Sequence, residues 1–241
     1  MVLAIQATLL PTQPATLLPS VTPKPTVAPL LTLQAPAKQI ITPSLSTIFQ
    51  LCSPLEGTAL NELPEIVSDP YHPPPMGKDE RHQGVDFSYY RRGERLSIEG
   101  VNIQSVLPGR VAASISNSFP FGNMLIVETP GTNLPQAVRT RFNIQDGESL
   151  YILYAHLQSP PGLELGQEVQ SCQELGQVGK TGNAGVAHLH LEMRHGKAGV
   201  QFPVMSYYKA GDTPAEQANY LLWATSGAFL HFDPMDFLSS K

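Results

Sequence analysis

The sequence is short of charge, of cysteine and of long apolar runs, and each shortage argues against a class of protein. Its 241 residues include two cysteines, and 15% of them are charged. No CxxC pair occurs, so a zinc–thiolate site is not expected. No apolar run reaches the roughly 18 residues that a membrane span needs. The net charge is −5 and no basic patch is interleaved with aromatic residues, which argues against nucleic acid as a partner.

The abundant residue types indicate one domain rich in turns. Hydrophobic residues make up 41% of the chain, enough for a core, while 23 prolines and 19 glycines favour turns over long helices. The length accommodates one ordinary domain and a tail. Met1–Ile5 is apolar without a basic flank, and Pro11 follows early, so no signal peptide is recognised. We expect that the true start lies upstream or that export information was trimmed away.

A proline-rich stretch fills most of the first 46 residues. Eight prolines lie between Pro11 and Pro43, among Thr, Ala, Leu and Gln with almost no charge. Such a composition favours extended, polyproline-like chain and cannot close a core. We expect residues 1–46 to be a disordered, extended segment. It is either a semi-rigid tether between a membrane and an extracellular domain or a plain disordered tail.

Beyond residue 47 the chain changes to short β-type segments bounded by turn residues. Five of these segments, rich in Val, Ile, Leu and Tyr, are predicted strands: Arg110–Ser114, Asn123–Glu128, Ser149–His156, Glu168–Gln173 and His188–Arg194. Because no helical period separates them, they predict a mainly β, antiparallel domain. One helix is predicted late in the chain, where Thr213–Glu216 reads as a capping box. Its body would be Gln217–Thr225, and Gly227 would end it.

The placement of the histidines is the strongest chemical signal. His188 and His190 lie two residues apart in a strand-like run, so both imidazoles point to one face. His82 and Asp86 supply a further imidazole and a carboxylate four residues apart, and His156 ends another predicted strand. Each motif alone is ambiguous, since a lone histidine is more often structural and an H-x-H pair also suits cupin-like metal sites. Together they indicate a metal site with additional catalytic groups.

The order of the motifs resembles that of a known family. Six motifs occur in sequence: His82-Gln83-Gly84-Val85-Asp86-Phe87, Gly109-Arg110-Val111-Ala112, Gly122-Asn123-Met124-Leu125-Ile126-Val127, Tyr154-Ala155-His156-Leu157, Gly176-Gln177-Val178-Gly179-Lys180-Thr181-Gly182 and His188-Leu189-His190-Leu191-Glu192. This series is similar to the M23 metallopeptidases of the lysostaphin and LytM type. The resemblance covers roughly residues 77–195 and resumes at Phe232–Leu238. It implies a duplicated hybrid-motif β-sheet core within residues 47–241, with long loops and one helix in a late insertion.

The resemblance also implies roles for five residues. His82, Asp86 and His190 would hold one Zn²⁺ per chain, and three protein ligands are typical of a catalytic zinc site. His156 and His188 would act as the catalytic groups beside the metal. One would move a proton and the other would stabilise the oxyanion, in an order that the sequence leaves open. The implied reaction is zinc-dependent hydrolysis of peptide bonds in bacterial peptidoglycan stems or cross-bridges.

Two other functions stay open at this point. The chain could be a non-catalytic LytM-type domain that binds and activates another cell-wall hydrolase, although such relatives lose zinc ligands and this chain keeps all three. A cupin-like metal-binding barrel would not account for Tyr154–Leu157. Gly179-Lys180-Thr181 resembles the end of a phosphate-binding loop, but position 174 is Glu174 and no helix follows, so no nucleotide is expected.

The remaining expectations concern the surroundings of the site. Cys52 and Cys172 are either two buried thiols or one intrachain disulfide, which an oxidising compartment would allow. Two stretches, Pro130–Gly147 and Lys197–Leu230, exceed the compact family pattern, as either specificity loops or surface padding. Both are expected to leave activity intact. We expect an extracytoplasmic bacterial protein, secreted or associated with the cell envelope, that acts as a monomer on peptidoglycan peptides.

Overall fold

The computed structural model describes residues 49–75 and 77–239 of the chain. The predicted tether over residues 1–46 lies outside the described residues. Within the described part, no helix is both long and apolar enough to cross a membrane.

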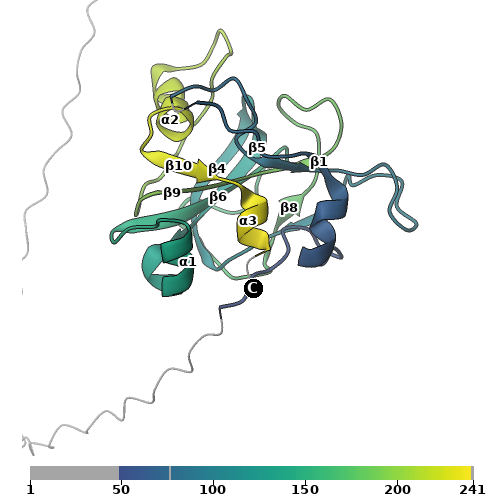
Figure 1. Cartoon of the computed structure of the whole chain (residues 1–241). Helices are drawn as coiled ribbons and strands as arrows, with labels where there is room; N and C mark the ends of the chain where they lie inside the picture. Colours follow the sequence, from purple (N-terminus) through teal and green to yellow (C-terminus); the bar gives the residue numbers. More distant parts are fainter. Residues whose placement is uncertain (1–48, 76, 240–241) are drawn as a thin grey trace, which may run out of the picture. The chain divides into compact units, whose positions relative to one another are not determined.

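An antiparallel β-sheet organises the described residues (Figure 1). Its eight strands are β1 (Val67–Asp69), β2 (Val85–Phe87), β4 (Gly109–Ser118), β5 (Gly122–Pro130), β6 (Glu148–Ala155), β7 (Glu168–Val169), β9 (Leu189–Lys197) and β10 (Phe229–Phe232). They lie in the order β1-β2-β9-β6-β5-β4-β7, and β10 pairs with β9 beyond the end of β2. A separate two-stranded sheet joins β3 (Asn102–Gln104) to β8 (Glu174–Gln177). The predicted mainly β, antiparallel fold is confirmed.

Four of the five predicted strands are present, as β4, β5, β6 and β9. The fifth prediction, a continuous strand over Glu168–Gln173, is wrong. Only Glu168–Val169 is a strand, because the chain then turns: the Gln173 amide donates to the Gln170 carbonyl at 3.2 Å, and Cys172 has φ +61°. The pairing resumes at Glu174 in β8, on the second sheet.

The predicted late helix is α2 (Pro214–Ala224). Thr213 caps it as expected, since its side chain accepts from the Glu216 amide and the Glu216 carboxylate accepts from the Thr213 amide. Two α-helices were not predicted, α1 (Gln136–Arg141) and α3 (Pro234–Leu238), nor were the 3₁₀-helices η1 (Leu60–Ile66) and η2 (Gly131–Asn133). All four are seven residues or shorter, too short to show a helical period.

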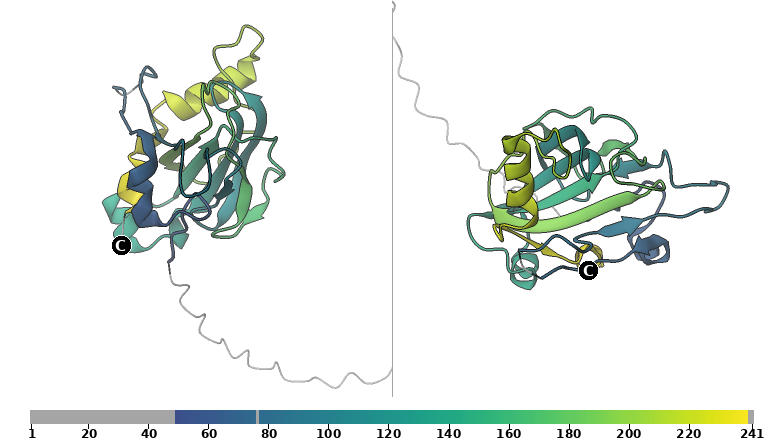
Figure 2. Two further views of the ribbon diagram at one scale, coloured as in Figure 1. Left: turned by 90° about the vertical axis from the view of Figure 1, so that its right-hand side faces the viewer. Right: turned by 90° about the horizontal axis from the view of Figure 1, so that it is seen from above.

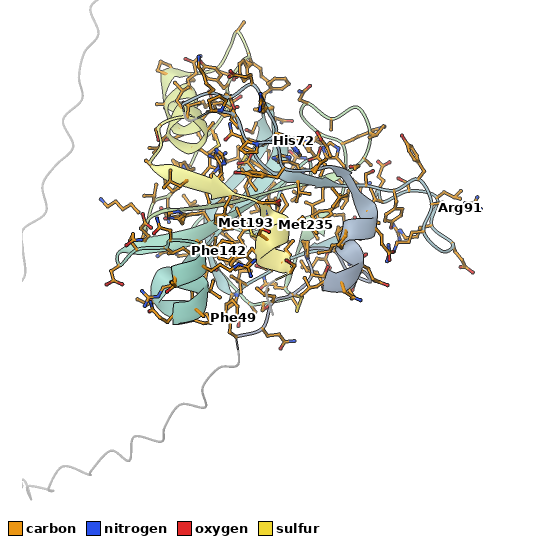
Figure 3. The ribbon with its side chains drawn as sticks, in the orientation of Figure 1. Phe49, His72, Arg91, Phe142, Met193 and Met235 are labelled. Carbon is orange, nitrogen blue, oxygen red and sulfur yellow. A yellow bond between two sulfur atoms is a disulfide. The ribbon has the colours of Figure 1, made fainter. Side chains whose placement is uncertain are left out.

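The sheet is buried on both faces, and alternate residues of its central strands belong to different hydrophobic clusters. On β6, Ile152 and Tyr154 face one cluster while Tyr151 and Leu153 face the other. Helices η1, α1 and α3 lie on the first face, and α2 lies on the second (Figures 1 and 2). Met193 of β9 belongs to the first cluster and Met235 of α3 packs against it; both are labelled in Figure 3.

Cys52 and Cys172 form an intrachain disulfide, with their Cα atoms 5.3 Å apart. The Cys52 amide donates to the Val106 carbonyl and the Cys172 amide to the Ser105 carbonyl, both at 2.9 Å. The disulfide therefore fastens the segment before η1 to the turn between β7 and β8. Of the two alternatives left open by the sequence, the structure has the disulfide.

Candidate functional site

The five predicted site residues come together on or next to three neighbouring strands, with His82 just before β2. In the sheet, Asp86 of β2 is the register partner of His190 on β9, and His190 is the partner of Ala155 at the end of β6. His156 follows directly after Ala155, and His188 comes just before β9. Adjacent positions across antiparallel strands bring side chains within about 5 Å of each other. Pairing of β2, β9 and β6 is thus what assembles the site.

Three of these residues form a tight cluster. Asp86 Oδ1 lies 2.8 Å from His190 Nδ1 and 3.0 Å from His82 Nε2, and the two nitrogens lie 3.0 Å apart. Among the described residues, His82, Asp86 and His190 are the one group of three such side chains whose atoms could hold a single metal ion. His190 is buried, while His82 and Asp86 remain partly open to solvent.

In His82 and His190, the ring nitrogen that faces away from Asp86, called here the remote nitrogen, donates a hydrogen bond to a fixed acceptor. His82 Nδ1 donates to the Pro70 carbonyl at 2.9 Å. His190 Nε2 donates to Glu192 Oε1 at 3.1 Å. Because a ring nitrogen that donates to such an acceptor carries the proton, the nitrogen on the opposite side of a neutral imidazole presents a lone pair. For His82 and His190 that nitrogen faces Asp86.

The electrostatics of the cluster favour a positive charge at its centre. Burial disfavours charge on Asp86, but hydrogen bonds from His190 and His82 outweigh it and hold the pKa of that carboxyl well below its usual range. Burial likewise lowers the pKa of His190, yet the hydrogen bonds to Asp86 and Glu192 overcome it and raise that pKa to about 10. A proton or a metal cation among these groups is therefore strongly stabilised.

His156 and His188 lie beside the cluster and face each other. Their ring centroids are 4.5 Å apart, and His188 Nε2 lies 3.4 Å from Asp86 Oδ2. Nδ1 of His156 donates to the Thr181 carbonyl at 2.7 Å, and Nδ1 of His188 to the Val186 carbonyl at 3.0 Å. Burial, together with the neighbouring His190 and His188, lowers the pKa of His156 to about 3.

The cluster lies in an open groove of about 480 Å³, within the range of ligand-binding pockets. Phe119, cis-Pro120 and Phe121 line one part of it. Tyr208, Tyr220 and Ala224, from the stretch Lys197–Leu230, line another part. No described residue of the stretch Pro130–Gly147 lines this groove. Of the two long stretches, the later one contributes to the site.

The comparison with known families identifies the chain. Residues 80–202, about half of the chain, match the sequence profile described as Peptidase family M23. This chain belongs to peptidase family M23. The match spans the H-x-x-x-D motif at His82, the Tyr154–Leu157 motif and the H-x-H motif at His188, so the resemblance predicted from the motifs is confirmed.

The M23 chain is also similar to several solved structures. One is the catalytic domain of the antimicrobial peptidase lysostaphin from Staphylococcus simulans, 20% identical over 76% of this chain and 99% of that chain, with a TM-score of 0.43. Another is the catalytic domain of the prophage-encoded M23 protein EnpA from Enterococcus faecalis, 20% identical over 63% and 89%, with a TM-score of 0.40. A third is a zinc-containing peptidase from Vibrio cholerae, 21% identical over 53% and 32%, with a TM-score of 0.36. No curated protein matches the chain.

Sequence reasoning missed four residues that support the M23 site. Glu192 and Arg194 continue the two-residue period of His188 and His190, so the strand pattern alone could have placed them on the same face. Trp223 and Asp79 gave no such signal, because their contacts join segments that are distant in sequence: Trp223 with Glu192, and Asp79 with Tyr208 and Tyr220. Trp223 Nε1 donates to Glu192 Oε2 at 2.8 Å, and Asp79 Oδ2 accepts from Tyr208 at 2.7 Å.

Proposed function

We propose that this M23 chain is a zinc-dependent endopeptidase that hydrolyses peptide bonds in the stems or cross-bridges of bacterial peptidoglycan. In this proposal His82, Asp86 and His190 hold one zinc ion. His156 and His188 are the catalytic groups that flank it.

The observation that carries the proposal is the group of three acceptor atoms at the centre of the site. His82 Nε2, His190 Nδ1 and Asp86 Oδ1 lie 2.8–3.0 Å from one another, while both remote nitrogens are committed to other acceptors. Atoms that bear lone pairs repel one another at this separation unless a proton or a cation lies among them. Two imidazole nitrogens and one carboxylate oxygen are also a donor set typical of catalytic zinc. The residues therefore fit the metal.

The chemistry divides between the metal and two imidazoles. Zinc held there supplies Lewis acidity, which makes water nucleophilic near neutral pH and polarises the scissile carbonyl. His156 and His188 fix their Nδ1 protons on backbone carbonyls, so the Nε2 atom of each is available to the reaction. Each Nε2 can accept a proton from water, return it to the leaving amine, or donate to a developing oxyanion once it is protonated.

The groove and the disulfide support the choice of substrate and location. The groove is open and about 480 Å³ in volume, which suits an extended peptide rather than a small enclosed ligand. The Cys52–Cys172 disulfide fits an oxidising compartment outside the cytoplasm. Resemblance to the lysostaphin and LytM type supplies the substrate class, peptides of the cell wall.

The proposal is tested by digesting defined muropeptides with purified protein and identifying the fragments by mass. The parent chain should contain about one zinc ion and release peptide fragments. His190→Ala should lose both zinc and cleavage, because removal of one of three ligands leaves the other two without a stable ion. His156→Ala should keep zinc while its turnover falls by about 10²–10⁴-fold, the usual contribution of a group that transfers a proton or stabilises an oxyanion.

Two outcomes would contradict the proposal. A His190→Ala protein that keeps zinc and cleaves at the parental rate would overturn the assignment of the ligands. A parent chain that binds zinc, cleaves no muropeptide and stimulates a second wall hydrolase would favour the non-catalytic activator instead.

A further inference from the structure

Glu192 lies two residues after His190 on β9, and its carboxylate contacts the His190 ring. Its Oε1 accepts from His190 Nε2 at 3.1 Å, on the side of the ring that faces away from Asp86. The Glu192 side chain is buried. A carboxylate in this position fixes both the ring orientation and the tautomer of a metal-binding histidine. The direction of the His190 Nδ1 lone pair therefore depends on where Glu192 is held.

The other oxygen of Glu192 is held by two side chains. Oε2 accepts from Trp223 Nε1 at 2.8 Å, and from Arg194 Nε and Nη2 at 2.9 and 2.7 Å. Trp223 belongs to α2, 31 residues further along the chain, and is fully buried. The indole N–H is the one polar group of that side chain, and it is aimed at the carboxylate. A purely packing role would not require this donor.

Helix α2 is itself fixed around this contact. The Trp223 carbonyl accepts from Arg194 Nη1 at 2.7 Å, and the Arg194 guanidinium lies 4.7 Å from the centroid of the Trp223 ring. One turn earlier, the Tyr220 hydroxyl donates to Asp79 at 2.5 Å. Figure 2 shows α2 beside β9, the strand that carries His190. Trp223 is thus held at both its backbone and its ring.

We propose that Trp223 is a positioning residue for His190 that acts through Glu192, so that the stretch Lys197–Leu230 is part of the metal centre. The inference rests on the proposed function, since it takes His190 to be a zinc ligand. It differs from the expectation that this stretch leaves activity intact. With the indole N–H in place, Glu192 Oε2 accepts hydrogen bonds from both Trp223 and Arg194. Without the indole N–H, Arg194 is the remaining donor to Oε2, and we expect the carboxylate to shift relative to His190.

The test compares zinc affinity in two variants of the full chain. Trp223→Phe removes the donor and keeps an aromatic ring, and it should raise the dissociation constant for zinc about tenfold, as loss of such a supporting contact usually does. Phe202→Leu is the matched control. Phe202 packs against Trp223 with ring centroids 5.6 Å apart and is equally buried, but it makes no hydrogen bond to Glu192. Its zinc affinity should equal that of the parent.

Zinc affinity would be measured by competition with a coloured chelator. Thermal unfolding of the zinc-free proteins would show whether Trp223→Phe and Phe202→Leu have the same stability. The visible absorption of the cobalt-substituted proteins adds a readout of ligand geometry. It should change in Trp223→Phe and stay unchanged in Phe202→Leu. A merely structural tryptophan would leave this spectrum unmoved.

A double-mutant cycle shows whether Trp223 acts through Glu192. Glu192→Gln should weaken zinc binding at least as much as Trp223→Phe, and the double variant should be no weaker than Glu192→Gln alone. Parental zinc affinity in Trp223→Phe, equal weakening in Phe202→Leu, or additive effects in the cycle would each overturn the inference. If Trp223→Phe does not fold, parental zinc affinity in Glu192→Gln would overturn it instead. A parent chain that binds no zinc would refute the proposed function and not this contact alone.

Discussion

Gly84 occupies a position beside the His82, Asp86 and His190 cluster where no side chain fits. A Cβ atom there would lie 2.5 Å from the Leu191 carbonyl oxygen and 2.9 Å from His190 Cε1. The residue lies between His82 and Asp86 and does not have a positive φ, so it is the close approach of β9, and not a left-handed conformation, that requires glycine. Any larger residue must displace the strand that carries His190.

Gly84→Ala should therefore weaken zinc binding although the glycine has no ligand atom. Overpacking of this kind typically costs about 1–3 kcal/mol of stability, and we expect zinc affinity to fall about tenfold or more. Thermal unfolding with and without zinc would measure both effects. Gly185→Ala is the matched control, since nothing lies within 4 Å of a Cβ at that position. Equal zinc affinity in the two variants would show that β9 yields without moving His190.

Protons should compete with zinc for the same cluster. Burial alone would lower the pKa of His190, but Asp86 and Glu192 raise it to about 10 in the metal-free site, and the Asp86 hydrogen bond likewise outweighs burial to raise the pKa of His82. Since the His190 imidazole favours the protonated form near neutral pH, zinc must displace at least one proton to bind. Affinity should therefore rise with pH, about tenfold per pH unit for each proton released. Zinc titrations between about pH 6 and pH 8 would measure the slope, and a flat profile would contradict the assignment.

At the scale of single elements, β9 determines the site by its alternation. Leu189, Leu191 and Met193 face one hydrophobic cluster, while His190 and Glu192 face the groove side. The alternation of apolar and polar residues is visible in the sequence, so the strand and the paired histidines could be predicted from it. The elements that escaped prediction are three to seven residues long, and segments of that length show little periodicity.

The disulfide acts on the segment that precedes η1. It closes a loop with a sequence separation of 120, and cross-links across loops of this size typically add about 3–5 kcal/mol to stability. Reduction should therefore lower the free energy of unfolding by about this amount, measured by denaturant titration with and without a reductant. A Cys52→Ser, Cys172→Ser double variant is the control and should not respond to the reductant. Equal stability of the oxidised and reduced parent would mean that the pairing adds nothing to the fold.

At the scale of the whole described domain, the two faces of the sheet differ in what they bury. One face packs on η1, α1 and α3 as a continuous apolar core. The other accommodates α2 together with the buried polar group around Glu192 and Arg194. The motifs predicted the five side chains that meet in the groove, because each motif is local in sequence. They could not predict Trp223 or Asp79, because a contact between distant segments leaves no local pattern.

The residues that surround the cluster extend along the chain from Pro70 to Trp223, and β10 pairs with β9 later still. During synthesis, the strand that carries His190 leaves the ribosome before Trp223, which contacts His190 through Glu192. A nascent chain halted between these points therefore has its ligands but lacks their support. On our inference, chains that end between His190 and Trp223 bind zinc more weakly than chains that include Trp223.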